Sequence, residues 1–238
     1  MSEAGANYLD LSVCIMCVDS DKHYLTECLK TLPQGCEVHV MYNGPSETGE
    51  ETFEKLGTKE LGETTIHTYR WGWVHFDFAT GRNKVCSLAE RGWILWIDAD
   101  ESLMVQQHDF LREKLNEYPL GVAALRCGVA GIQPPMLEGD ETQRFHSQQP
   151  RLFRNGLGIQ FYGRCHEQIV FDINKMGLQV IDCSLMIHHR GYIIDADAMV
   201  RKMIRNVTLL AEQVANEDPE QRVTFDFFAA MLARDATN

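Results

Sequence analysis

Residues 92–101 read Gly-Trp-Ile-Leu-Trp-Ile-Asp-Ala-Asp-Glu, an apolar run that ends in an acidic cluster. Its length and its β-branched and aromatic residues predict a strand buried on both faces, as in the interior of a parallel sheet. Ligands of open α/β sheets bind at the carboxyl ends of such strands. We therefore expect the carboxylates of Asp98 and Asp100 to stand where a ligand can reach them.

Strand and helix signals alternate ahead of this run. Strands are predicted at residues 11–18, 37–42, 64–73 and 92–97, and helices at residues 22–32, from the acidic segment 47–54 and at residues 78–91. Such alternation is typical of a parallel, doubly wound sheet. The chain is thus assigned to the α/β class, with a Rossmann-like first half over about residues 1–103.

The pattern changes in the second half, about residues 104–195. A helix at residues 105–118 precedes short strands at 122–129, 151–154, 159–162, 168–172 and 178–188, which indicate a mixed or antiparallel sheet. Residues 131–149, rich in Pro, Gly and polar residues, are a candidate active-site lid or simply a solvated loop. An amphipathic pattern over residues 196–215 predicts a closing helix within 196–217, and residues 218–238 form a helical extension with a helix at 225–232.

Composition narrows the class of protein. The 238 residues are 45% hydrophobic and 24% charged, which suffices for one well-buried domain. A net charge of −12 disfavours a nucleic-acid partner and an anionic membrane surface. The sequence has no apolar run of membrane-spanning length and no signal-peptide pattern, so we expect a cytoplasmic protein without stable membrane insertion. The eight cysteines, including the Cys14/Cys17 pair, are interpreted as buried thiols.

The acidic cluster can bind a metal ion. If extended geometry continues past Ile97, Asp98 and Asp100 project to one side, where a divalent cation could bridge them to a diphosphate. Such a cation neutralises charge on a leaving phosphate. Taken alone, the pattern fits equally well an acidic cluster ahead of the next helix.

A second motif lies just upstream, in residues 77–84, Asp-Phe-Ala-Thr-Gly-Arg-Asn-Lys. Combined with the run at 92–101, it resembles the family 2 glycosyltransferases, in the branch of the lipopolysaccharide-core and peptide S-glycosyltransferases. The resemblance continues through Pro-Arg-Leu-Phe-Arg-Asn at 150–155, through Phe161, Gly163, His166 and Glu167, and through His-Arg-Gly-Tyr at 189–192. It covers roughly residues 11–220 and implies a GT-A fold: a Rossmann-like nucleotide-binding half, a mixed sheet and C-terminal helices.

The resemblance also implies a donor site for a nucleotide sugar, with a UDP-sugar favoured. Cys17, Val18, Asp19 and Asn43 would line the base, Arg82 would contact base or phosphate, and Asp98, Ala99 and Asp100 would complete the donor site. Asn43 departs from the family, which usually has an aspartate there. An amide both donates and accepts hydrogen bonds, so it can still bind a uracil edge, although without charge.

An inverting transferase needs a base that takes the proton of the acceptor as it attacks, and a carboxylate serves well. Glu167 is the candidate, with Asp140 and Glu101 as rivals. In the competing interpretation Glu167 only pairs with Arg164 or Arg151.

The metal site is predicted from Asp98, Asp100 and, by resemblance, His189. A nitrogen ligand beside carboxylates favours Mn²⁺ over Mg²⁺. His189 could instead be a structural residue, with His188 as a competing ligand. Arg151, Arg154 and Arg190 could clamp the diphosphate or form ordinary salt bridges.

The tryptophans fall into two pairs. Trp93 and Trp96 belong to the buried strand and are predicted in the core. If the segment is extended, Trp71 and Trp73 lie on the same face and could line the bottom of the donor or acceptor site.

These observations predict an inverting, metal-dependent glycosyltransferase that uses a nucleotide sugar. Its acceptor is left open among a peptide, a saccharide, a small molecule and a modified nucleobase. A nucleotidyltransferase would also use paired aspartates, but residues 18–21, Val-Asp-Ser-Asp, do not form the Gly-rich phosphate loop it needs. A non-catalytic nucleotide-sugar or carbohydrate-binding module is the third reading.

Overall fold

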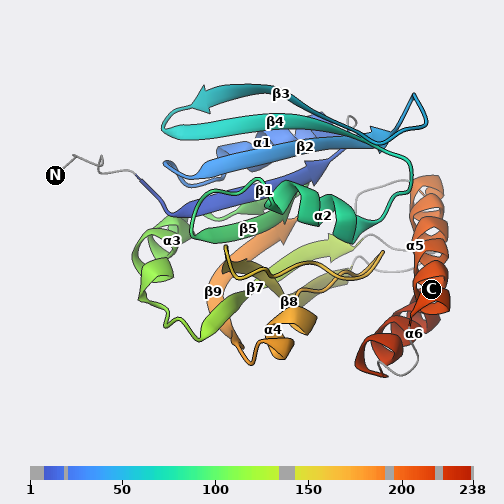
Figure 1. The fold of residues 1–238 in the computed structure, drawn as a ribbon. Helices are drawn as coiled ribbons and strands as arrows, with labels where there is room; N and C mark the ends of the chain where they lie inside the picture. Colours follow the sequence, from blue (N-terminus) through green and yellow to red (C-terminus); the bar gives the residue numbers. More distant parts are fainter. Residues whose placement is uncertain (1–7, 19–20, 134–142, 191–195, 218–221, 237–238) are drawn as a thin grey trace.

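The computed structural model describes residues 8–18, 21–133, 143–190, 196–217 and 222–236, and in these ranges it forms one mixed sheet with helices on both faces (Figure 1). The strands are β1 (Leu11–Cys17), β2 (Glu37–Pro45), β3 (Thr52–Leu61), β4 (Thr64–Trp73), β5 (Trp93–Asp98), β6 (Glu101–Leu103), β7 (Val122–Gln133), β8 (Gln143–Arg154) and β9 (Gln179–His189). The helices are α1 (Lys22–Lys30), α2 (Phe78–Cys86), α3 (His108–Lys114), α4 (Val170–Lys175), α5 (Ala196–Asn216) and α6 (Arg222–Ala236). Short 3₁₀ turns at Val105–Gln107 and Leu115–Glu117 flank α3.

The strand order is β3-β4-β2-β1-β5-β8-β7-β9-β6. Strands β4, β2, β1 and β5 run parallel, which confirms the doubly wound first half. Beyond β5 the sheet is mixed, because β8 pairs antiparallel with β5 and β7, whereas β9 runs parallel to β7. The chain reverses its winding at β1, so the carboxyl ends of β1 and β5 form the switch point where α/β sheets bind ligands.

The central strands are buried on both faces, as their continuous apolar sequences require. In β5, Trp93, Leu95 and Ile97 enter one core cluster, together with Leu25 of α1 and Leu111 of α3. The alternate residues Ile94 and Trp96 enter the other cluster, together with Val85 of α2 and Ile173 of α4. Because side chains alternate along a strand, the same strand fills both layers and holds its carboxyl end rigidly between them.

The helix expected from residues 47–54 is wrong. Residues 52–61 form β3, which pairs antiparallel with β4 at the edge of the sheet. The acidic residues fitted a first helical turn, but Phe53 instead stacks on Tyr69 of β4, with ring centroids 5.6 Å apart. The cross-strand contact outweighs the local charge preference.

Three further expectations need correction in the second half. Residues 159–162 form only an isolated bridge, between Tyr162 and Gln168. Residues 170–175 form helix α4, with Ile169 and Ile173 buried four residues apart, a spacing that fits a helix rather than a strand. At the two ends of the segment 131–149, residues 131–133 and 143–149 are strand, since β7 extends to Gln133 and β8 begins at Gln143. The remainder of the candidate lid, residues 134–142, lies outside the described residues.

Helices α5 and α6 stand together at one end of the sheet (Figure 1). They pack around Leu209, Leu210 and Phe228, which form a separate apolar cluster with Cys165. The helical extension predicted for residues 218–238 thus contributes α6. Among the helices described, none is long and apolar enough to cross a bilayer.

The buried carboxylate of Glu37, at the opposite end of the sheet, makes the stability of the fold depend on pH. Glu37, 6% exposed, accepts hydrogen bonds from the Ser12 hydroxyl at 2.6 Å and the Glu90 amide at 3.1 Å, and lies 3.0 Å from His39 Nε2. Burial alone would raise the pKa of Glu37, but the His39 and Ser12 contacts and the Glu90 amide lower it from 4.5 to about 2.

This carboxylate should stabilise the fold above its unfolded pKa of 4.5 and lose that contribution as the pH falls towards 2. We expect Glu37→Gln to lower the free energy of unfolding at pH 7 by roughly 2 kcal/mol. The difference between variant and wild type should shrink between pH 4.5 and 2. Urea unfolding at several pH values checks this, with the exposed Glu54→Gln as control; a difference independent of pH would contradict it.

Candidate active site

A cavity of about 760 Å³ opens at the carboxyl ends of β1 and β5. All of the described residues predicted for the donor, metal and catalytic sites line it: Cys17, Val18, Asn43, Arg82, Asp98, Ala99, Asp100, Glu167 and His189. Asp19 lies outside the described residues, as does Asp140, one of the rival bases. The described residues predicted from distant parts of the sequence therefore line the same cavity in the fold.

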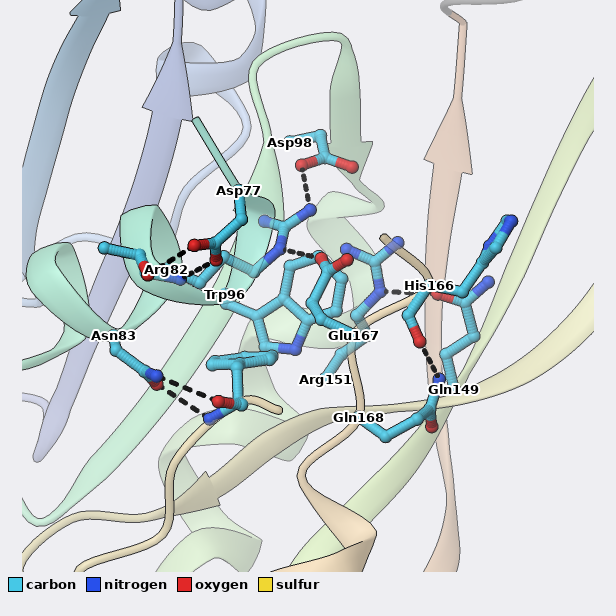
Figure 2. Close-up of polar contacts among 12 residues, drawn as sticks. Asp77, Arg82, Asn83, Trp96, Asp98, Gln149, Arg151, His166, Glu167 and Gln168 are labelled. Carbon is cyan, nitrogen blue, oxygen red and sulfur yellow. Dashed lines mark hydrogen bonds and ion pairs between the residues drawn. The ribbon is translucent and has the colours of Figure 1, made fainter. Parts of the chain in front are cut away.

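Arg82 is the centre of this site. Asp77 caps α2 by accepting a hydrogen bond from the Thr80 amide at 2.6 Å, so the helix presents Arg82 towards the end of β5. The guanidinium donates from Nη2 to Asp98 Oδ1 at 2.9 Å and from Nε to Glu167 Oε1 (Figure 2). Arg82 thus links the acidic cluster to the candidate base. The competing partners of Glu167 pair with other carboxylates: Arg164 with Glu212 at 2.6 Å and Arg151 with Glu101 at 2.8 Å.

Trp96 lies between two guanidinium groups. The carbon of the Arg82 guanidinium is 3.8 Å from the centroid of its ring, and that of Arg151 is 3.5 Å from it. Arg151 also donates to both oxygens of Glu101, at 3.0 and 2.8 Å. Stacked, charge-paired arginines of this kind hold their positions firmly. Trp96 is 8% exposed, as predicted for a core residue, yet it also lines the cavity.

Two of the three arginines proposed as diphosphate clamps are engaged by the protein itself. Arg151 is 3% exposed and forms a buried pair with the rival base Glu101. Arg154 donates to the backbone carbonyls of Val122 and Tyr118, at 2.9 and 2.6 Å. The ordinary alternative, salt-bridged or structural arginine, holds for these two residues.

Asp100 and His189 face each other across the pairing of β6 with β9. Oδ2 of Asp100 lies 3.7 Å from Nε2 of His189. Burial, followed by the charge of Asp98, raises the pKa of Asp100 to about 6, and burial lowers the pKa of His189 to about 4. A half-buried carboxylate beside a neutral imidazole is a donor pair that a divalent cation would satisfy.

Asp98 differs from Asp100, because its Oδ1 is bound by Arg82. Burial would raise the pKa of Asp98, but the charge of Arg82 outweighs it and lowers the pKa to about 2. Within the described ranges, no three His, Cys, Asp or Glu side chains group into a complete metal site. The residues present fit a cation held by Asp100 and His189 that takes further ligands from a bound substrate.

The described residues predicted to line the nucleotide base lie at the ends of β1 and β2. Asn43 donates from its side-chain amide to the Cys17 carbonyl at 2.8 Å, which joins the ends of β2 and β1. The Val18 amide donates to Asp21 Oδ2 at 3.0 Å. The predicted base-binding residues therefore lie next to one another.

Sequence reasoning missed the contribution of the C-terminal helices and misplaced one tryptophan pair. Lys202 and Arg205 of α5 and Phe227, Met231 and Arg234 of α6 line the cavity. The sequence periodicity predicts the helices α5 and α6, but it does not show which face of each helix lies against a cavity formed by distant residues. Trp71 is 1% exposed in the core and donates to Glu51, and neither it nor Trp73 lines this cavity.

The chain is similar in sequence to part of two known proteins. No protein-family model matches the chain. It is 28% identical over 176 residues to a TPR repeat-containing protein of Synechococcus elongatus, across 74% of this chain and 38% of that protein. It is also 28% identical over 156 residues to the SPbeta prophage-derived glycosyltransferase SunS of Bacillus subtilis, across 66% of this chain and 35% of SunS. The chain therefore spans little more than a third of the length of these relatives.

Solved structures share the fold at low sequence identity. TarS (residues 1–349) from S. aureus superposes with a TM-score of 0.51 and 13% identity, covering 94% of this chain and 71% of that one. The mannosyltransferase PcManGT from Pyrobaculum calidifontis, solved with GDP-Man and Mn²⁺, gives a TM-score of 0.51 over 98% of this chain and 76% of that one. The fold is the GT-A type of glycosyltransferases, as the sequence predicted. The similarity to SunS and the motifs are consistent with a family 2-like glycosyltransferase.

Proposed function

We propose that this protein is an inverting, metal-dependent glycosyltransferase that takes a sugar from a nucleotide sugar, with a UDP-sugar favoured. The observation that carries the proposal is the cavity at the switch point, where Asp100, His189, Arg82 and Glu167 meet. PcManGT, a GT-A neighbour, was solved with GDP-Man and Mn²⁺, and SunS is a glycosyltransferase, which supports this class of donor.

In this proposal the nucleotide lies against Cys17, Val18 and Asn43, and the diphosphate extends towards Asp100. Asp100 and His189 hold a divalent cation, with Mn²⁺ favoured by the imidazole ligand, and Asp98 stays a predicted further ligand. When bound, the cation offsets the charge that develops on the leaving diphosphate. The raised pKa of Asp100 supports this role, because a nearby cation would favour its charged form.

Glu167 is proposed as the general base. Its side chain is 9% exposed, and its Oε1 accepts from Arg82, which fixes the carboxylate towards the cavity. The second oxygen can then accept the proton of the acceptor as the new bond to the anomeric carbon forms. The acceptor would enter along α5 and α6, where Phe227 and Met231 line the cavity.

Donor turnover without an acceptor tests the proposal, because water can then take the sugar. The purified chain is incubated with UDP-, GDP-, CDP- or dTDP-sugars and with Mn²⁺ or EDTA, and the free nucleoside diphosphate is measured. We expect release from one nucleotide class that requires the cation. Binding of a nucleotide sugar with no release would instead support a non-catalytic module, and the proposal of an enzyme would fail.

A further inference from the structure

The loop that carries Glu167 is held by both helices of the α5–α6 pair. The Arg164 amide donates to Gln213 of α5 at 3.0 Å. Phe228 of α6 is fully buried and packs directly on Gly163, where a Cβ would overlap its ring. The backbone φ of Gly163 is 110°, a conformation that residues other than glycine rarely adopt. The loop therefore has no room to move as long as α6 is docked.

His166, the residue before Glu167, has an unusual backbone. Its φ is 55°, and it is the one non-glycine residue with positive φ in the described ranges. The left-handed region is sparsely populated by residues with a side chain, so surrounding contacts must maintain it. Its ring supplies such a contact, since Nε2 lies 2.6 Å from Oδ2 of Asp235 on α6.

The Asp235 carboxylate is itself fixed. Its side chain is 12% exposed, and Oδ1 accepts from Nε and Nη2 of Arg234, at 2.9 and 2.7 Å. Arg234 Nη2 also lies 2.9 Å from His166 Nε2, the same nitrogen that contacts Asp235. One nitrogen cannot donate to Asp235 and accept from Arg234 at once, so the contact that acts on His166 is the one in which Nε2 donates to Asp235, while Arg234 holds the Asp235 carboxylate in place. A partly buried, charge-assisted contact of this kind opposes the strain of a left-handed residue.

We infer that Asp235 is a positioning residue for the transfer reaction: by holding the His166 ring it keeps residue 166 left-handed, and so aims the adjacent Glu167 carboxylate at Arg82 and the cavity. The inference rests on the proposed role of Glu167. Helix α6 would then help to position the proposed base, although Asp235 is 68 residues away from Glu167 in the sequence.

Hydrogen exchange tests the positioning without any need for turnover. In Asp235→Asn we expect the amides of residues 163–168 to exchange about tenfold faster, because the amide keeps an acceptor oxygen but loses the charge that strengthens the hydrogen bond with His166. Asp235→Glu keeps the charge and should recover most of the protection. Asp226→Asn, an exposed position on the same helix, is the matched control and should leave exchange unchanged.

Kinetics test the consequence for the reaction. In Asp235→Asn the kcat of donor turnover should fall roughly tenfold while KM for the donor stays within about twofold, since the donor site is untouched. His166→Gly removes the need for the contact, because glycine adopts positive φ without strain. Adding Asp235→Asn to His166→Gly should therefore cause no further change in exchange or in kcat.

Two results would overturn the inference. One is unchanged exchange at residues 163–168 in Asp235→Asn, and the other is an additive loss in the double variant, which would assign Asp235 a purely structural role in docking α6. If the wild-type chain shows no turnover, the proposed function fails, whereas the exchange measurements still decide whether Asp235 holds the loop.

Discussion

Replacing Arg82 with methionine is expected to lower the free energy of unfolding by about 3–5 kcal/mol, the usual cost of removing one partner from a buried ion pair. The Arg82 side chain is 8% exposed, and its removal leaves both Asp98 and Glu167 without their cation. It also removes the guanidinium that stacks on Trp96. Urea unfolding monitored by tryptophan fluorescence measures the change.

Arg126→Met is the matched control for this prediction. Arg126 also pairs with an aspartate, Asp182 at 2.7 Å, but the two side chains are 44% and 64% exposed. Solvent screens such a pair, so its loss should cost less than about 1 kcal/mol. Equal effects of the two substitutions would contradict a central structural role for Arg82. If Arg82→Met does not fold, Arg82→Lys, which keeps the charge but loses the forked geometry, should show an intermediate loss.

Replacing Glu167 with glutamine should lower the kcat of donor turnover by about 10²–10⁴-fold, the range that a general base contributes. The glutamine oxygen can still accept from Arg82, so the loop should keep its place while the basic group is lost. Stability and donor affinity are therefore expected to stay close to those of the wild type.

Steady-state kinetics and calorimetric donor binding on the same preparation check this separation. Glu27→Gln, an exposed carboxylate on α1, serves as the control and should leave both quantities unchanged. Full activity in Glu167→Gln would remove Glu167 from the proposed mechanism. A parallel loss of donor affinity would assign it to the donor site rather than to proton transfer.

The first half of the fold could be predicted because its signals are local. Residues 93–97 are apolar at every position, and such a run has to lie inside a two-sided sheet. The error at residues 52–61 has the opposite cause. That strand is exposed along almost its whole length, so no apolar pattern marks it, and only its pairing with β4 defines it.

The candidate site could be predicted in part. Asp98, Asp100, Glu167 and His189 were selected from their motifs, and the structure places them around one cavity. Their ion pairs were not predicted, because pairing between distant segments does not appear in the periodicity of the sequence. Arg82 is 85 positions from Glu167 in the sequence, and Arg151 is 50 from Glu101. The contact of Asp235 with His166 belongs to the same group of long-range pairs.

A metal-dependent donor site at the end of β5 can be tested by calorimetric titration of nucleotide sugars into the wild-type chain and Asp100→Ala, with Mn²⁺ and with EDTA. One nucleotide sugar should bind to the wild type with Mn²⁺. Its affinity should fall by about tenfold or more, or about 1.4 kcal/mol, both in EDTA and in Asp100→Ala. Binding that is indifferent to the cation and to Asp100, or no binding of any nucleotide sugar, would contradict a metal-dependent donor site at the end of β5.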